Sequence, residues 1–358
     1  MNPKTELNEL FELALKQSAS DIHLSVGRRP TVRIDGDLIP VSAKPILTPE
    51  SSEELVLALL RPEQKEKLLQ EKEIDFSYSY EDKARFRVNV YYERGFLSAA
   101  LRFIPSNIRT IEELNLPTIL HKFIEPNQGF FLVVGPSGHG KSTTLAAMID
   151  EINHTRQEHI ITIEDPIEYL FLQDKSIVDQ REIGFDSLSF HKALRSAFRQ
   201  DPDVIMVGEM RDPETISTAI TAAETGHLVF STLHTNNASQ TIDRIIDSFP
   251  SSQQPQIRIQ LASTLLGIAS QRLIPRIEGG RVPAVELLIA NSAVRNLIRE
   301  NKVYQIDLVL ETGAEEGMIS LNRSLADLVR RGEISRENAE IYSLNPRELG
   351  NLIGKHAV

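Results

Sequence analysis

Eight consecutive residues, Gly135 to Ser142, have the composition and spacing of a phosphate-binding loop. They fit the pattern GxxxxGKS/T and lie between an apolar run and a helical segment, the context that the motif requires. Backbone N–H groups of such a loop point at phosphate oxygens, and the helix N-terminus adds positive potential. We predict nucleotide binding, with Lys141 on the outer phosphates and Ser142 on Mg²⁺. The predicted nucleotide-binding residues are Gly135, Pro136, Ser137, Gly138, His139, Gly140, Lys141, Ser142 and Thr143.

One position of this loop is unusual. His139 stands where such loops usually carry a small residue. The favoured interpretation is an exposed side chain that the loop tolerates.

A second segment, Asp201 to Glu209, contains an apolar strand that delivers a carboxylate at its end. Ligands gather at the carboxyl ends of strands in open parallel sheets. In a phosphate-binding-loop enzyme, a group there holds the Mg²⁺ shell or orients water, which predicts that role for Glu209. Gly208 and Glu209 stand where an aspartate usually ends such a strand, and a helix-capping acid is the alternative.

A third segment is the β-branched run Ile160 to Ile163, which ends in Glu164, Asp165 and Pro166. Proline stops the strand and leaves the two acids at its edge, on the same rim as the phosphate-binding loop if the sheet is parallel. This position predicts a general base near the γ-phosphate. A solvated turn is the alternative.

A fourth segment, Leu228 to Thr232, is another apolar strand, followed by His234 in a polar cluster. A histidine just past a strand end suits sensing of the γ-phosphate or of a neighbouring subunit. Taken alone, a structural histidine would be expected, but the three neighbouring motifs favour the functional interpretation.

The elements that position these motifs alternate as strand, loop and helix from Phe130 to Thr232, which predicts a parallel sheet covered by helices. The first 105 residues differ. A helix is predicted over Met1 to Ser18 from its apolar spacing, and Arg85 to Tyr92 alternates with period two, which places Arg85 and Arg87 on one strand face. From Pro255 to the end the chain is predicted to be mostly helical.

The composition excludes several classes of function. A formal charge of -11 disfavours a polyanion as the main partner, so no nucleic acid is expected. The chain has no cysteine, which excludes disulfides and thiol catalysis and fits a reducing compartment. No apolar run is long enough for a membrane span, and the N-terminus does not fit a signal peptide. A cytoplasmic location is predicted.

The four motifs, in this order and spacing, resemble those of the secretion ATPase superfamily (GspE/PulE). Gly135 to Ser142 matches its Walker A motif, Ile161 to Glu168 its Asp box, Asp203 to Asp212 its Walker B motif and Gly226 to Asn236 its His box. The resemblance implies an α/β fold: a RecA-like P-loop core, a smaller N-terminal α+β, PAS-like domain and a helical C-terminal region. The implied domains are 1–107, a linker at 108–118, and 119–358, with the helical part from about 255.

The resemblance also implies a mechanism. Members of the superfamily form hexameric rings with ATP between the N-terminal domain of one subunit and the P-loop domain of the next. Glu164 would activate the attacking water, Glu209 would order Mg²⁺ directly or through water, and His234 would report on the γ-phosphate. Arginines would neutralise charge on the transferred phosphoryl group. The candidates are Arg85, Arg87, Arg102, Arg195 and Arg199.

The carboxyl region resembles one group within the superfamily. Ala293 to Glu300 reads AVRNLIRE and differs at Val294 from the AIRNLIRE motif of PilT-type twitching-motility, or type IV pilus retraction, ATPases. An amphipathic helix with its arginines outside would give the same pattern. The implied partners are a PilC-type platform protein and a paralogous retraction ATPase, at the inner membrane beneath the pilus.

Three alternatives remain open at this stage. An accessory retraction ATPase would carry the same motifs, and an extension or type II secretion motor would usually be longer, with an extra N-terminal domain. A RecA-like nucleic-acid translocase would share the P-loop and the parallel sheet, but it should have basic pore loops and a turnover that nucleic acid stimulates.

Overall fold

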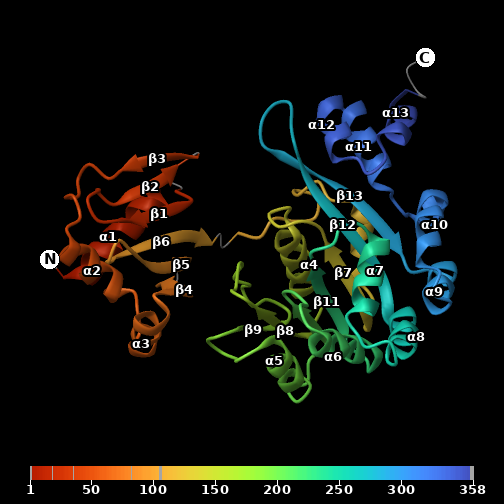
Figure 1. Cartoon of the computed structure of the whole chain (residues 1–358), viewed down its shortest axis with the longest axis horizontal. Helices are drawn as coiled ribbons and strands as arrows, with labels where there is room; N and C mark the ends of the chain where they lie inside the picture. Colours follow the sequence, from red (N-terminus) through yellow and green to blue (C-terminus); the bar gives the residue numbers. More distant parts are fainter. Residues whose placement is uncertain (1, 18, 35, 82, 105–106, 355–358) are drawn as a thin grey trace. The chain divides into compact units, whose positions relative to one another are not determined.

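The structure is a computed structural model that describes residues 2–17, 19–34, 36–81, 83–104 and 107–354 (Figure 1). The chain divides into two compact units. Unit 1 comprises residues 1–107 and 166–170, and unit 2 comprises residues 108–165 and 171–358. Each unit has its own hydrophobic core.

Unit 1 is built on a six-stranded sheet in the order β3-β2-β1-β6-β5-β4, in which every pair is antiparallel. Period-two alternation in β5 buries Phe86, Val88 and Val90 on one face, while Arg85 and Arg87 lie on the other, as predicted. The elements are α1 (Pro3–Lys16), β1 (Asp21–Leu24), β2 (Thr31–Ile34), β3 (Asp37–Pro40), α2 (Pro49–Ala58), α3 (Pro62–Glu71), β4 (Glu73–Tyr80), β5 (Ala84–Glu93) and β6 (Phe96–Ile104).

The predicted N-terminal helix is present as α1. Asn2 caps it by accepting a hydrogen bond from the backbone N–H of Lys4, and Pro3 begins the helix with a favourable φ angle. The four apolar positions in its pattern are all buried: Leu7, Leu10, Phe11 and Ala14.

Unit 2 contains a seven-stranded sheet in the order β13-β12-β7-β11-β10-β8-β9. All neighbouring pairs are parallel except β12 with β13. The elements as far as the hairpin are η1 (Thr118–Phe123), β7 (Gly129–Val134), α4 (Lys141–Thr155), β8 (His159–Glu164), β9 (Ile177–Glu182), α5 (Phe190–Ala197), β10 (Val204–Val207), α6 (Pro213–Glu224), β11 (Leu228–Leu233), α7 (Ala238–Asp247), α8 (Gln254–Thr264), β12 (Leu265–Pro275) and β13 (Arg281–Ile289).

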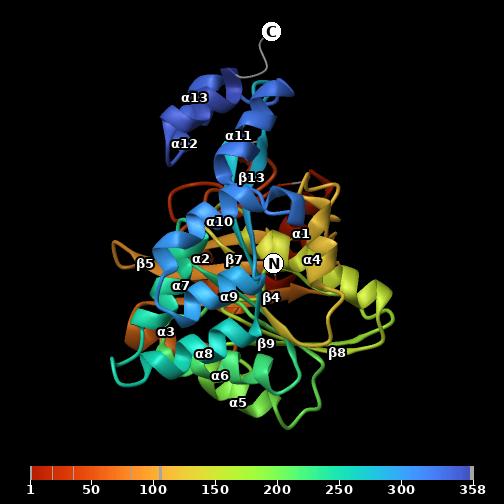
Figure 2. The ribbon, with the colours of Figure 1, turned by 90° about the vertical axis from the view of Figure 1, so that its right-hand side faces the viewer.

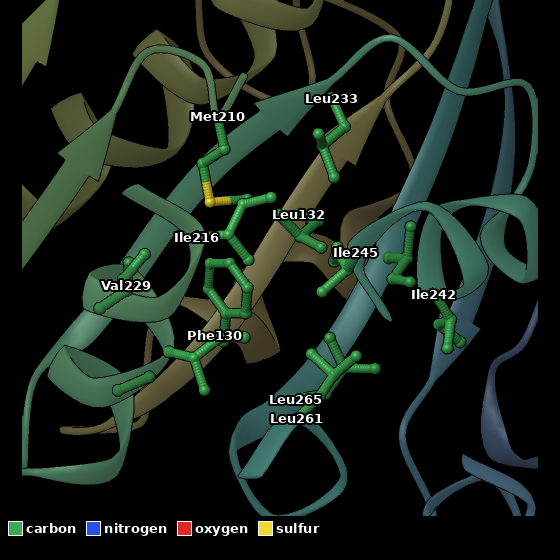
Figure 3. Close-up of a cluster of buried hydrophobic side chains, with 14 of the residues drawn as sticks. Phe130, Leu132, Met210, Ile216, Val229, Leu233, Ile242, Ile245, Leu261 and Leu265 are labelled. Carbon is green, nitrogen blue, oxygen red and sulfur yellow. The ribbon is translucent and has the colours of Figure 1, made fainter. Parts of the chain in front are cut away.

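Helices cover both faces of this sheet. Side chains from α5, α6, α7 and α8 form one core with alternate residues of the central strands, such as Phe130 and Leu132 (Figure 3). Helix α4 packs on β7 and β11 outside that core. Burial on both faces explains why the central strands are continuous apolar runs rather than alternating ones.

The sequence prediction missed three strands of unit 2. Strand β9 is a polar strand at the edge of the sheet, and the hairpin β12–β13 interrupts the region predicted to be helical from about 255. Strand β12 follows α8 without a turn, because Leu265 is both the C-cap of the helix and the first residue of the strand. The hydrophobic pattern of the sequence therefore did not reveal where the helix α8 ends and the strand β12 begins.

Helices do dominate after the hairpin. The later elements are α9 (Ser292–Arg299), η2 (Val303–Gln305), α10 (Ile306–Thr312), η3 (Gly313–Glu316), α11 (Leu321–Arg330), α12 (Arg336–Tyr342) and α13 (Pro346–Gly354). The last three, α11 to α13, group at one end of the hairpin (Figure 2) and share a small core with Ile274, Val282 and Ala284.

Within the described part of the chain, no helix combines the length and the apolar character needed to cross a membrane.

Candidate nucleotide site

The predicted phosphate-binding loop joins the buried strand β7 to the first residue of α4, which is the strand–loop–helix context expected from the sequence. Gly138 and Gly140 have φ angles of 77° and 83°, a region that favours glycine. The Lys141 ammonium is buried and donates to the carbonyl oxygens of Gly135 and Pro136, at 2.9 Å each. Ser142 is exposed at the helix N-terminus.

His139 is a structural part of the loop, which differs from the interpretation of a tolerated exposed side chain. Its Nδ1 accepts a hydrogen bond from the backbone N–H of Leu273 at 2.9 Å, and the ring lies 6.4 Å from that of Tyr342. Burial lowers the pKa of His139, and the charges of Arg272 and Lys141 add to the effect. The neutral ring that this favours is the form that can accept the bond.

Glu164 ends β8 with its carboxylate buried. Its Oε1 accepts from the Thr162 hydroxyl at 2.6 Å and from the Gln180 amide at 3.2 Å. These two bonds fix the orientation of the carboxylate, as a general base requires. The sequence analysis predicted neither donor. Thr162 lies on the predicted strand but was not singled out, and Gln180 comes from the unpredicted strand β9.

Glu209 follows β10, and its position depends on Gly208. A Cβ atom at residue 208 would lie 3.2 Å from the Ile163 carbonyl oxygen and 3.5 Å from the Glu164 Cα. Glycine therefore lets the Walker B strand end directly beside the Asp box. Glu209 Oε1 pairs with Arg211 at 2.5 Å, a partner that the sequence reasoning did not single out.

His234 follows β11 and lies next to Glu209, with 3.7 Å between its Nε2 and Glu209 Oε2. Burial lowers the pKa of His234, and the charge of Lys141 lowers it further, while Glu209 opposes both. The Glu209 carboxylate raises the pKa of Arg211, and the charge of Asp165 contributes. Charged groups of all four motifs therefore influence one another at the carboxyl ends of the parallel strands.

The candidate arginines lie in both units. Arg85 and Arg87 are on β5, Arg102 is on β6, and Arg195 and Arg199 are on α5 and just after it. Arg87 and Arg102 are opposite each other on β5 and β6, and Arg102 Nε is 3.0 Å from Asp21 Oδ1. Arg195 is on α5, and both Arg195 and Arg199 are exposed. Arg199 lies past the C-terminus of that helix, shortly before β10 begins, and so near the end of the sheet opposite to Glu209 within the same chain.

The segment AVRNLIRE forms α9 and the residue after it. Val294 and Ile298 are buried, as the amphipathic pattern predicts, but Arg295 does not point freely outward. Its guanidinium donates to the carbonyl oxygens of Ala262, Ser263, Leu265 and Ala290 at 2.7–2.8 Å. It therefore caps the C-terminus of α8.

The donor set fits Mg²⁺. Ser142 and Glu209 offer only oxygen ligands, which hard cations prefer. Across the described residues there is no group of three or more His, Cys, Asp or Glu that could hold a metal ion on its own. Mg²⁺ commonly takes one or two protein ligands and completes its shell with phosphate oxygens and water.

Comparisons with known proteins agree with the motifs and the fold. The family described as "Type II/IV secretion system protein" matches residues 3–292. The chain is 47% identical over 334 residues to the type IV pilus retraction ATPase PilT of Pseudomonas aeruginosa, covering 93% of this chain and 97% of that protein. It is 48% identical over 321 residues to a twitching motility protein of Neisseria gonorrhoeae, covering 89% and 86%. A crystal structure of the pilus retraction motor PilT with bound ADP superposes with a TM-score of 0.90 at 50% identity, covering 96% of this chain and 98% of that one.

Proposed function

The chain belongs to the type II/IV secretion system protein family, and we propose that it is an ATP-hydrolysing motor that powers type IV pilus retraction. The observation that carries the proposal is the convergence of Lys141, Glu209 and His234 at the carboxyl ends of the parallel strands. Such a site can position a nucleoside triphosphate and stabilise the charge that develops during phosphoryl transfer.

Each part of the site has its own role in ATP hydrolysis. Backbone N–H groups of the loop and Lys141 bind the phosphates, and Ser142 with Glu209 would hold Mg²⁺, which neutralises phosphate charge when it is bound. Glu164, held by Thr162 and Gln180, accepts a proton from the attacking water. His234 lies beside Glu209 at the same edge, where it can respond to the γ-phosphate.

The proposal extends to assembly. The motor acts as a homohexameric ring, in which Arg85, Arg87, Arg102, Arg195 or Arg199 completes a neighbouring subunit's site. It is located in the cytoplasm on the inner membrane at the pilus base, where it contacts a PilC-type platform protein and works with a paralogous retraction ATPase. Support comes from the named functions of the retraction ATPase and retraction motor that resemble it.

Steady-state ATP hydrolysis by the purified chain, with its mass in solution, tests the proposal. We expect a Mg²⁺-dependent ATPase of hexamer size. Glu164→Gln should lower kcat by about a hundredfold or more, because general base catalysis is lost while phosphate binding is kept. Glu209→Gln should lower kcat to a similar extent, because Mg²⁺ would lose a negatively charged ligand. Glu214→Gln, an exposed acid in the first turn of α6, is the matched control and should retain wild-type activity.

Retraction is tested in a piliated strain that lacks its own retraction motor. Expression of this chain should restore twitching, and the Glu164→Gln variant should not. A folded hexamer with negligible turnover would contradict the motor role and indicate an accessory subunit. An active ATPase that restores pilus assembly instead of retraction would indicate an extension motor.

A further inference from the structure

Strand β12 lies directly beside the phosphate-binding loop. It pairs in parallel with β7, and Ser270 is opposite Val134, so Gln271 lies next to Gly135, the first residue of the loop. A Cβ atom at residue 135 would lie 2.4 Å from the Gln271 carbonyl oxygen. The loop therefore starts in van der Waals contact with the backbone of Gln271, which only glycine permits.

The side chain of Gln271 ties the other end of the loop to α4. It is 3% exposed. Its amide nitrogen donates to the His139 carbonyl oxygen at 2.9 Å, and its amide oxygen accepts from the Thr144 hydroxyl at 2.6 Å. A carbonyl oxygen can only accept, so the His139 bond fixes which end of the amide faces the loop.

Two neighbouring features depend on the same contact. A Cβ atom at Gly140 would lie 2.8 Å from Gln271 Nε2, so the amide occupies the space that glycine leaves. Leu273, two residues further along β12, donates its backbone N–H to His139 Nδ1 at 2.9 Å. The loop is therefore held by β12 at its start, at His139 and at the first turn of α4.

We propose that Gln271 is a positioning residue for nucleotide binding, which holds the phosphate-binding loop in the conformation that receives the phosphates. The inference rests on the proposed function, because it requires that the loop bind nucleotide. A loop that is already ordered loses less conformational entropy when the phosphates bind, which raises affinity. Removing the two hydrogen bonds of the Gln271 side chain should weaken nucleotide binding without removing any group that touches the nucleotide.

The test measures the Kd for Mg²⁺–ADP by calorimetry, with thermal unfolding of the nucleotide-free protein alongside. Gln271→Leu keeps the side chain's approximate size and removes both hydrogen bonds, and we expect the Kd to rise roughly tenfold. Thr144→Val removes one of these hydrogen bonds and should raise the Kd by a smaller factor. Thr144→Ser keeps the hydroxyl, and its Kd should stay near the wild-type value. The KM for ATP should rise by a larger factor than kcat falls, because ground-state binding is weakened.

Gln260→Leu is the matched control. Gln260 lies on α8 and donates one side-chain hydrogen bond to Glu224, so this change should leave the Kd for Mg²⁺–ADP unaltered. If Gln271→Leu does not fold, Thr144→Val tests the inference instead. A raised Kd with an unchanged melting temperature would support the positioning role of Gln271.

A folded Gln271→Leu variant with wild-type Kd would overturn the inference while leaving the proposed function intact. A lower melting temperature with no change in Kd or KM would overturn it too, since the residue would then be only structural. Wild-type protein that does not bind Mg²⁺–ADP would instead refute the proposed function, and the inference with it.

Discussion

Gly208, a residue without a side chain, lets the strand that carries Glu209 end beside Glu164; these are the two carboxylates that we propose act in catalysis. Gly208 precedes Glu209, and its Cα approaches the backbone of Ile163 and Glu164 so closely that a methyl group would be 3.2 Å from a carbonyl oxygen. At such a distance the neighbouring strand must shift by a few tenths of an ångström. Displacement of that kind at a phosphoryl-transfer site affects the rate more than the fold.

Gly208→Ala should therefore lower kcat for ATP hydrolysis by roughly tenfold, since small displacements of reacting groups are costly. Its melting temperature should change little. Gly350→Ala is the control, because Gly350 lies within α13 with no atom closer than 4.0 Å to the added methyl, and alanine favours a helix. Equal kcat for Gly208→Ala and wild type would show that the two strand ends tolerate separation.

A buried acid provides a second prediction at this scale. Glu286 lies on β13, and burial raises its pKa from 4.5 to about 7, although the Ala238 N–H donates to its carboxylate at 2.8 Å. Between these two values the unfolded chain loses this proton while the folded chain keeps it. The contribution of Glu286 to the free energy of unfolding must therefore fall by about 3 kcal/mol as the pH rises from 4.5 to about 7.

Glu286→Gln removes the titration and keeps an oxygen that can accept from Ala238. The variant should therefore be more stable relative to wild type at pH 8 than at pH 5, as measured by thermal unfolding at both values. A difference in melting temperature that is the same at both pH values would contradict the raised pKa.

At the scale of elements, α9 supports α8. Arg295 on α9 donates to three carbonyl oxygens at the end of α8, groups that have no partner within their own helix. The motif that indicated retraction ATPases therefore also has a structural role in this chain.

Arg295→Ala should lower the free energy of unfolding by about 2 kcal/mol, because several charge-assisted hydrogen bonds are lost from partly buried carbonyls. Denaturant titration measures this. Arg299→Ala is the control on the same helix, since Arg299 is exposed and its guanidinium donates to the Asn296 side chain nearby. Similar losses for both variants would mean that general helix propensity, rather than the cap, explains the effect.

The elements also show what the sequence could reveal. Strands β7, β8, β10 and β11 were predictable because each is a short apolar run that ends at a turn or a motif. Strand β12 was not, since Gly267 and Ser270 interrupt its apolar pattern and no turn precedes it. The sequence therefore predicted no role for Gln271. Its contacts with His139 and Thr144 join positions more than 120 residues apart, which no local spacing encodes.

At the scale of the whole molecule, unit 1 presents a second set of charges. The sheet face opposite the core with α1 carries Arg87 directly across from Arg102, and Asp21 pairs with Arg102 on the next strand. Such an arrangement can bind phosphate, and the proposed ring would supply it to a neighbouring subunit. Whether an arginine acts in its own subunit or in the next one can be decided by mixing variants.

Arg87→Ala and Glu164→Gln should each lower ATP hydrolysis by at least about a hundredfold when every subunit carries the change. Rings that mix the two variants contain some intact sites. In such a site the P-loop comes from an Arg87→Ala subunit and the arginine comes from a Glu164→Gln neighbour. When the two variants are mixed in equal amounts, each of these two conditions is met at roughly half of the sites, so about one quarter of the sites are intact. About a quarter of wild-type activity should therefore return. If Arg87 acts within its own subunit, every site keeps one defect and no activity returns. Mixing Lys141→Ala with Glu164→Gln is the control: both defects lie in unit 2, so no intact site can form and hydrolysis should stay absent.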